Sequence, residues 1–315
     1  MRSIMTVRTM IGFVALAAAA ALVAGCRPAS GPEVVVYASQ DKIYADPLLQ
    51  QFTRESGIRV LALYDSEAVK TVGLANRLKS EAGRPVCDLF WNNEPFRTRL
   101  LQKEGVLLDG TNTIAFGVRQ RVLALNRWRL GATECPEGIE ALTNVVWRGR
   151  VAMAYPLFGT TATHLLALRQ RWGEARWTAW CRAMVENGVK LVDGNSVAAR
   201  LAQNGDVAVA LTDSDDVEAL RREGGSLEAR PLGADGLSLP NTAALVRGAP
   251  HPDAARTLLR YLHDPKVLES LQNAGAVDRA ESIGDRGASA AGPDWDRLIA
   301  EMTPALESLK QWFLR

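Results

Sequence analysis

Histidine is scarce in this chain, with three residues in 315, and none lies in a catalytic or metal-binding pattern. The sequence also contains no GxSxG, HExxH, Walker A or GxGxxG motif. These absences argue against the enzyme classes that depend on such motifs. We therefore expect no enzyme, and the alternative from this reasoning is a hydrolase or transferase that works with carboxylates dispersed along the chain.

An excess of charge of one sign is also missing. Lys and Arg number 37 against 35 Asp and Glu. Arg2 and Arg8 account for the difference, because the first 25 residues contain no acid. The rest of the chain is neutral, which argues against nucleic acid or an anionic membrane as the main partner. At 47% hydrophobic and 23% charged residues, the composition is that of a globular protein.

Only one long apolar run occurs, and it lies at the N-terminus. Residues 11–23 follow the two arginines and are too few to span a bilayer comfortably, so they predict a secretory signal. The run ends in Leu-Val-Ala-Gly-Cys, which resembles a bacterial lipobox with Cys26 as the lipidated residue. An ordinary signal peptide with a chance cysteine is the alternative. We expect a signal peptide over 1–25 and a tether over 26–32, with the remainder outside the cytoplasmic membrane.

Cysteine adds little to the function. Cys87, Cys135 and Cys181 remain after Cys26, an odd number, so at least one thiol stays free. None has CxxC spacing or a neighbouring histidine. The sequence therefore supports neither a zinc site nor a thiol nucleophile, and the three are expected to be small buried residues.

Short apolar runs alternate with helical patterns through most of the chain. This order predicts an α/β fold in which mostly parallel sheets are covered by helices. Two extended segments, 118–126 and 237–246, are expected to cross between two lobes and make a hinged clamshell. We expect one lobe over 33–122 plus 241–315, including the C-terminal helices, and the other over 123–240.

Polar residues follow several predicted strands, at the carboxyl ends where open α/β sheets bind ligands. The same residue types are preferred helix caps, which is the alternative for each loop taken singly. The candidate ligand-binding residues are Ser39, Gln40, Asp41, Asn93, Glu94, Gly159, Thr160, Thr161, Asn195, Asp213, Asp215 and Asp216.

Two of these segments suggest opposite charges in the ligand. Gly159, Thr160 and Thr161 open a predicted helix, where free N–H groups and the helix dipole suit an anion. Asp215 and Asp216 are adjacent carboxylates that repel each other unless a cation or metal lies between them. Their alternative role is a solvated cap for a helix over 217–223.

The chain resembles the substrate-binding proteins of bacterial ABC uptake systems, specifically the ferric-ion-binding group with the type II periplasmic-binding fold. The resemblance runs from about residue 33 to 313 through an ordered set of short motifs. These are VVYASQD at 35–41, CDLFWNNE at 87–94, RVLALN at 121–126, WRGRVAM at 147–153, FGTT at 158–161, NTAALV at 241–246 and HPDAA at 251–255. The resemblance implies a two-lobed, extracytoplasmic, monomeric protein that captures a small ligand and delivers it to a membrane permease.

The iron-binding residues of that family are replaced here. The family's histidine, glutamate and adjacent tyrosine pair fall on Asp41, Asn93, Asp215 and Asp216. The anion-holding part matches better, at Thr160, Thr161 and Asn195. The resemblance thus implies iron or an iron–anion complex as the transported ligand, with Asp41, Asp215 and Asp216 as an all-oxygen metal site.

The same residues suit a small zwitterion such as an aminophosphonate, whose ammonium group would meet the aspartates. No covalent cofactor is expected apart from the lipid on Cys26. A sensor in place of a permease remains an alternative partner.

Overall fold

The computed structural model describes residues 31–64, 72–130, 135–283 and 292–314. The predicted signal peptide, Cys26 and most of the predicted tether lie outside these residues. Among the described residues, none of the helices is both long enough and apolar enough to cross a lipid bilayer.

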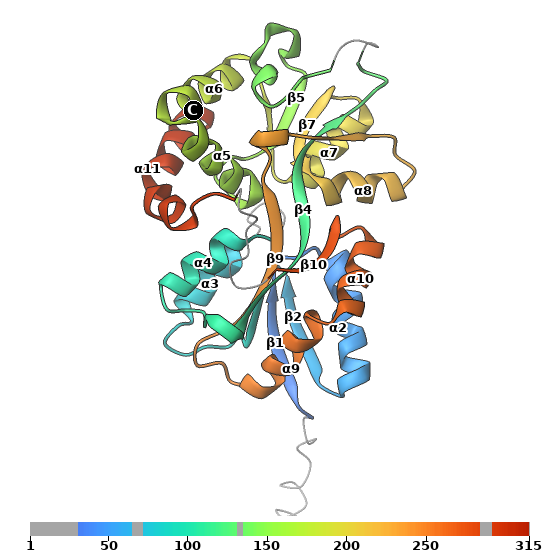
Figure 1. The fold of residues 1–315 in the computed structure, drawn as a ribbon, viewed down its shortest axis with the longest axis vertical. Coiled ribbons are helices and arrows are strands. Elements are labelled where there is room, and N and C mark those ends of the chain that lie inside the picture. Colours follow the sequence, from blue (N-terminus) through green and yellow to red (C-terminus); the bar gives the residue numbers. More distant parts are fainter. Residues whose placement is uncertain (1–30, 65–71, 131–134, 284–291, 315) are drawn as a thin grey trace, which may run out of the picture.

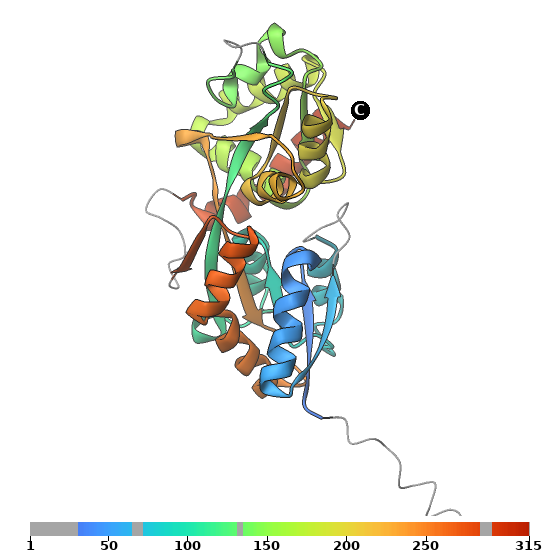
Figure 2. The same cartoon turned by 90° about the vertical axis from the view of Figure 1, so that its right-hand side faces the viewer.

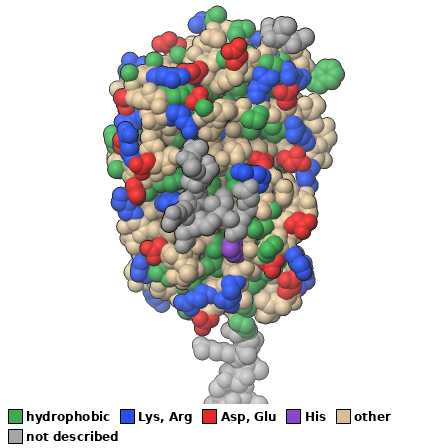
Figure 3. Space-filling view, in the orientation of Figure 1, with side chains coloured by type: hydrophobic (Ala, Val, Ile, Leu, Met, Phe, Trp, Pro, Cys, Tyr) green, Lys and Arg blue, Asp and Glu red, His purple; other side chains and the backbone are tan. Residues whose placement is uncertain are grey.

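The protein has two lobes stacked along its long axis, as Figures 1 and 2 show. A single sheet path, in the order β2-β1-β3-β9-β4-β7-β5-β6, runs through both of them. This arrangement confirms the predicted α/β clamshell. On the face seen in Figure 3, acidic and basic side chains are intermixed and do not form separate patches of one charge.

The lower lobe of Figure 1 is built on three parallel strands. They are β1 (Glu33–Ala38), β2 (Arg59–Tyr64) and β3 (Leu89–Asn92). Its helices are α2 (Lys42–Ser56), α3 (Val72–Ser80), α4 (Pro95–Lys103), α9 (Pro252–Leu262) and α10 (Pro265–Ala274). Buried β1 and β3 residues pack against α2, α9 and α10 on one face and against α3 and α4 on the other. This two-sided burial explains why both strands are apolar runs rather than alternating patterns.

The upper lobe repeats this plan. Its strands are β5 (Val151–Ala154), β6 (Lys190–Val192), β7 (Val209–Asp213) and β8 (Glu228–Pro231). Its helices are α5 (Gly159–Trp172), α6 (Glu174–Glu186), α7 (Asn195–Asn204) and α8 (Ser214–Arg222). Because β5 is parallel to both β6 and β7, the helices that follow these three strands begin at one edge of the sheet.

Two long strands join the lobes, where extended crossings were predicted. In β4 (Thr113–Leu125), residues 113–120 pair with β9 (Ser238–Leu245), and residues 121–125 pair with β7 and β8. The short strand β10 (Arg279–Ile283) pairs with the lower half of β4. A strand shared by both lobes is suited to act as a hinge.

A bulge in β4 fixes which side chains reach the space between the lobes. The register shifts between Phe116 and Val118, and Gly117 between them has a φ of 56°. A Cβ on Gly117 would lie 2.8 Å from Val277 Cγ1, so a side chain here would be strained and crowded. Beyond the bulge, Arg119 and Arg121 are two residues apart and therefore point to the same face of the strand.

The C-terminal helix differs from the predicted lobe boundaries. α11 (Trp295–Phe313) was expected with the lower lobe, but its buried residues join the core of the upper lobe. Trp312 contacts Trp177 of α6 edge to face, with ring centroids 5.3 Å apart. The apolar face of α11 packs against the tryptophans of α6. The spacing of apolar residues within α11 predicts that the helix has an apolar face, but it does not tell which lobe that face contacts.

His164 of α5 makes stability depend on pH. It is fully buried, its Nε2 lies 2.7 Å from the Asp235 carbonyl oxygen, and burial lowers its pKa to about 3. Between pH 6.5 and 3 the unfolded chain binds a proton that the folded chain does not. The free energy of unfolding therefore decreases as the pH is lowered through this range. We expect about 1.4 kcal/mol of lost stability per pH unit from this residue.

Urea denaturation from pH 7.5 to 4.5 should show a shallower pH dependence of the free energy of unfolding for His164→Gln than for the wild type. Equal slopes in the wild type, His164→Gln and the exposed-site control His263→Gln would contradict this.

Candidate functional site

A cavity that is open to solvent on one side lies between the lobes, beside the hinge strand. Its lining comes from the start of α2, the end of β3, β4, and the starts of α5, α7 and α8. The lining residues are Asp41, Asn93, Arg119, Ala154, Tyr155, Phe158, Gly159, Thr160, Thr161, Asp193, Gly194, Asn195, Asp213 and Asp216. The structure thus brings together predicted residues from five separate segments.

Arg121 ties three elements of the upper lobe together. Its side chain is 1% exposed, and its Nη1 donates to Asp213 Oδ1 at 2.7 Å and to Asn195 Oδ1 at 3.1 Å. Longer bonds of 3.4 Å reach the hydroxyls of Thr160 and Thr161. One guanidinium therefore holds the end of β7 and the starts of α5 and α7 in fixed positions.

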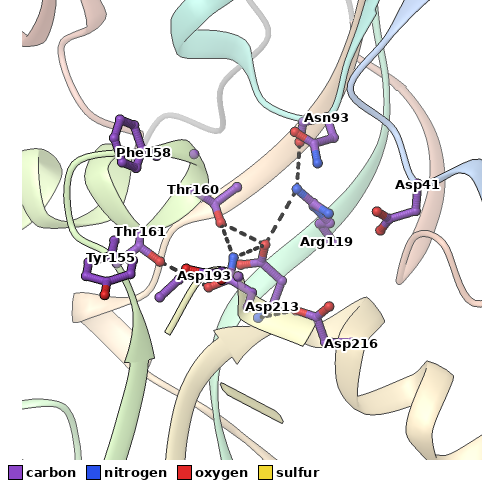
Figure 4. A pocket seen from close by; sticks show the side chains of 14 residues that line it. Asp41, Asn93, Arg119, Tyr155, Phe158, Thr160, Thr161, Asp193, Asp213 and Asp216 are labelled. Carbon is purple, nitrogen blue, oxygen red and sulfur yellow. Dashed lines mark hydrogen bonds and ion pairs between the residues drawn. The ribbon is translucent and has the colours of Figure 1, made fainter. Parts of the chain in front are cut away.

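Arg119 contacts both lobes. Its Nη1 donates to Asp215 Oδ2 at 2.7 Å in the upper lobe, and its Nη2 donates to the Asn93 carbonyl at 2.9 Å in the lower lobe. Nη2 also lies 3.5 Å from Asp213 Oδ2. Figure 4 shows the guanidinium between Asn93 and Asp213, with Asp41 across the cavity. Burial opposes the charge of Arg119, but these carboxylates outweigh it and raise its pKa.

The acidic segment at the end of β7 is not a loop. β7 runs to Asp213 and α8 begins at Ser214, so Asp215 and Asp216 lie in the first helical turn. Asp213 is the N-cap, and Asp216 Oδ2 accepts the Asp213 N–H at 3.3 Å in a capping box. The predicted boundary was therefore wrong by about three residues, because the capping box starts the helix before its first apolar residue.

The site shifts the pKa values of the three aspartates in different directions. The guanidiniums of Arg121 and Arg119 overcome the effect of burial and hold the pKa of Asp213 below its usual range. Burial, together with nearby Asp213, raises the pKa of Asp215 despite its ion pair with Arg119. The pKa of Asp216 is raised well above its usual range, by burial and then by the charges of Asp215 and Asp213.

The metal set expected from the sequence is not the set that the structure assembles. Within the described residues, Asp213, Asp215 and Asp216 offer oxygens that all lie within 4.8 Å of one another. Asp41 is absent from this group and belongs to the lower lobe, immediately before α2. A cation held by Asp41 with Asp215 and Asp216 therefore does not match the assembled cluster.

Two helix N-termini face the cavity. The N-cap residues Phe158 of α5 and Gly194 of α7 make no side-chain capping bond. The hydroxyl of Thr160 donates to Asp213 Oδ2 at 2.8 Å, and that of Thr161 donates to Asn195 Oδ1 at 3.0 Å. The hydroxyls therefore order the site, while the backbone N–H groups and the positive ends of both helix dipoles suit an anion.

Three predicted residues from the lower lobe do not line the cavity. Glu94 is fully buried and caps α4, accepting the N–H groups of Phe96 at 2.6 Å and Arg97 at 3.0 Å. Its predicted ligand-binding role is thus replaced by the cap that was its alternative. Ser39 and Gln40 are each 1% exposed and are not among the lining residues.

Several buried polar atoms around the cavity lack a hydrogen-bond partner in the described part of the chain. They are Asn93 Oδ1, Arg119 Nε, Asp215 Oδ1, Ser39 Oγ and both amide atoms of Gln40. Asn93 and Arg119 line the cavity, and buried groups of this kind are normally satisfied. Two residues of the cavity lining therefore carry an unpartnered acceptor, Asn93 Oδ1, and an unpartnered donor, Arg119 Nε.

The sequence reasoning missed both arginines as site residues. They stand at alternate positions in FGVRQRVLAL, an otherwise apolar strand. Charged residues on the buried face of a strand are costly unless they are paired. Two arginines in a strand that is otherwise apolar were therefore the feature of the sequence that could have identified Arg119 and Arg121, although they belong to no known motif.

The match to known proteins covers most of the chain. The family model described as bacterial extracellular solute-binding protein matches residues 33–276. The major ferric iron-binding protein of Neisseria meningitidis is 26% identical over 226 residues, which are 65% of this chain and 66% of that protein. The protein of the same name from Neisseria gonorrhoeae is 25% identical over 226 residues, which are 65% of this chain and 67% of that protein.

Solved structures share the fold. Iron-bound HitA from Pseudomonas aeruginosa has a TM-score of 0.73 at 18% identity, over 90% of this chain and 99% of that one. The periplasmic binding protein AfuA from Actinobacillus pleuropneumoniae, with exogenous fructose-6-phosphate bound, has a TM-score of 0.75 at 16% identity, over 90% and 99%. Proteins that hold chemically different solutes therefore share this architecture.

Proposed function

Because the chain belongs to the family of bacterial extracellular solute-binding proteins, we propose that it is the solute-capturing component of an ABC uptake system. It binds a small solute between its lobes outside the cytoplasmic membrane and delivers it to a permease. The cavity beside a hinge strand shared by both lobes supports this role. Family membership favours binding over the alternative of a carboxylate-dependent enzyme.

An oxyanion is the part of the solute that the site is best suited to hold. The observation that carries this proposal is the convergence of two uncapped helix N-termini and the guanidinium of Arg119 on one cavity. Each supplies partial or full positive charge in a place shielded from water. The solute would lie with its anionic group against Gly159 and Asn195.

Two solutes satisfy this requirement. The names of the Neisseria relatives favour ferric iron, which an anion at the helix N-termini would accompany. A small phosphonate or zwitterion is favoured by the site itself, because guanidiniums already pair with Asp213 and Asp215 and no tyrosine pair is present.

Asn195→Ala tests the location of the site. The variant removes the side chain that joins Arg121 and Thr161 at the start of α7, so we expect about tenfold weaker binding of the solute. Asn204→Ala, at the exposed end of the same helix, is the matched control and should bind as the wild type. The measurement is calorimetric titration with inorganic phosphate, an aminophosphonate and ferric citrate. If a probe binds both variants equally well, its site lies elsewhere.

A lipid tether at Cys26 completes the proposed role by keeping the protein beside its permease. Cys26→Ala should move the protein from the membrane fraction to the soluble or unprocessed fraction of cells. Metabolic labelling with a fatty acid provides the direct readout. If the wild-type protein incorporates no label, the tether is refuted, while solute capture is unaffected.

A further inference from the structure

The acidic cluster at the start of α8 has the form of a cation site, and an arginine occupies it. Oxygens of Asp213, Asp215 and Asp216 lie within 4.8 Å of one another. The guanidinium of Arg119 lies 2.7 Å from Asp215 and 3.5 Å from Asp213. The side chains of Arg119 and Asp215 are each 2% exposed, so the pair is shielded from solvent. A positive charge from the protein thus stands where a bound cation would stand.

The backbone holds Arg119 in this position. The bulge at Gly117 sets the direction of its side chain, and its Nη2 is anchored to the Asn93 carbonyl at 2.9 Å. Its Nε has no partner in the described chain, and the residue lines the cavity. The guanidinium therefore pairs with Asp215 and Asp213 through its terminal nitrogens, while its Nε–H has no partner among the described residues.

We propose that Arg119 determines the ligand class of this cavity: its guanidinium replaces a metal cation among the aspartates, so that the site selects an organic oxyanion and rejects free metal ions. This inference rests on the proposed function and chooses between its two solutes. The ligand is a phosphonate, phosphate ester or carboxylate. It also carries a hydrogen-bond donor, such as an ammonium or hydroxyl group, for Asn93 Oδ1, which is buried without a partner.

Charge explains the selectivity. A metal ion at the cluster would face the guanidinium of Arg119 at close range and, behind Asp213, that of Arg121. At about 4 Å and an effective dielectric constant of about 20, one such repulsion changes affinity by more than 100-fold. An oxyanion meets the same groups with attraction. The residue that excludes the cation is thus the residue that favours the anion.

Terbium(III) alone is the probe for a direct test. It prefers hard oxygen ligands, and Tyr155 in the cavity lining can sensitise its luminescence. The wild type should show no saturable terbium site above the weak binding of its surface carboxylates. Arg119→Met should create one saturable site, at least about 100-fold tighter than that background. Arg119→Lys retains the positive charge and should remain without the site.

A double variant tests whether terbium binds at the acidic cluster or at other carboxylates of the protein. Arg119→Met with Asp215→Asn removes one of the three carboxylates and should lose the new terbium site. If Arg119→Met is too unstable to purify in metal-free buffer, terbium should raise its melting temperature but not that of the double variant. Equal terbium affinity in the wild type and Arg119→Met, or in the single and double variants, would overturn the inference. Solute capture is tested separately by the phosphate, aminophosphonate and ferric citrate titrations of the wild type.

Discussion

Replacing Arg121 by methionine is expected to lower the free energy of unfolding by about 3–5 kcal/mol, because a buried carboxylate loses its partner. Asp213 is 3% exposed and depends on Arg121 for its shortest ion pair, at 2.7 Å. The same substitution removes the bonds to Asn195, Thr160 and Thr161. The melting temperature of the solute-free variant should be roughly 10 °C lower than that of the wild type.

The double variant Arg121→Met with Asp213→Asn distinguishes an unpaired charge from lost packing. It removes both charges, so a large part of the lost stability should return. Arg148→Met, at an exposed position of the same lobe, is the control and should melt within about 1 °C of the wild type. If Arg121→Met melts like Arg148→Met, Arg121 does not organise the site.

Two aspartates three residues apart are expected to respond in opposite directions to the same substitution. Asp213→Asn weakens the bonds to Arg121 and Arg119, whose charges hold the pKa of Asp213 low, and should cost about 3 kcal/mol of stability. Asp216→Asn removes a carboxylate whose pKa is raised by burial and by Asp215. The neutral amide avoids the cost of holding a negative charge at this position, so the variant should melt at or above the wild-type temperature.

Differential scanning calorimetry of the two solute-free variants at pH 7 provides the comparison. Asparagine keeps an oxygen at position 216 that can accept from Thr212 Oγ1, now at 2.7 Å, so the helix cap persists. A loss of stability in Asp216→Asn as large as in Asp213→Asn would show that the cap, rather than charge, dominates this segment.

The sequence predicted the parts of the fold that arise from local patterns. The buried strands β1, β3 and β5 are short apolar runs, and the helices between them show 3.6-residue spacing, so their order and type were correct. The hinge strands were predictable because β4 is an extended segment between the two series and β9 is an extended segment after the second one. The prediction that ligand-binding residues lie at strand ends placed Asn93, Thr160 and Asn195 at one cavity.

The remainder depended on contacts between distant segments. Counting charges along the chain cannot reveal that Arg119 meets Asp215, because 96 residues separate them. The placement of α11 on the upper lobe depends on the tryptophans of α6, and the role of Glu94 depends on the exact start of α4. The contact of Arg119 with Asp215 reversed the apparent chemistry of the site, from a cluster that needs a cation to one that already contains a guanidinium.

Native mass spectrometry of the protein purified from its own cells without chelator, with iron and phosphorus measured on the same sample, tests the central claim most directly. The account predicts one small organic oxyanion per chain and no stoichiometric iron. A single ferric ion as the sole adduct, retained by the wild type and by Arg119→Lys, would contradict it.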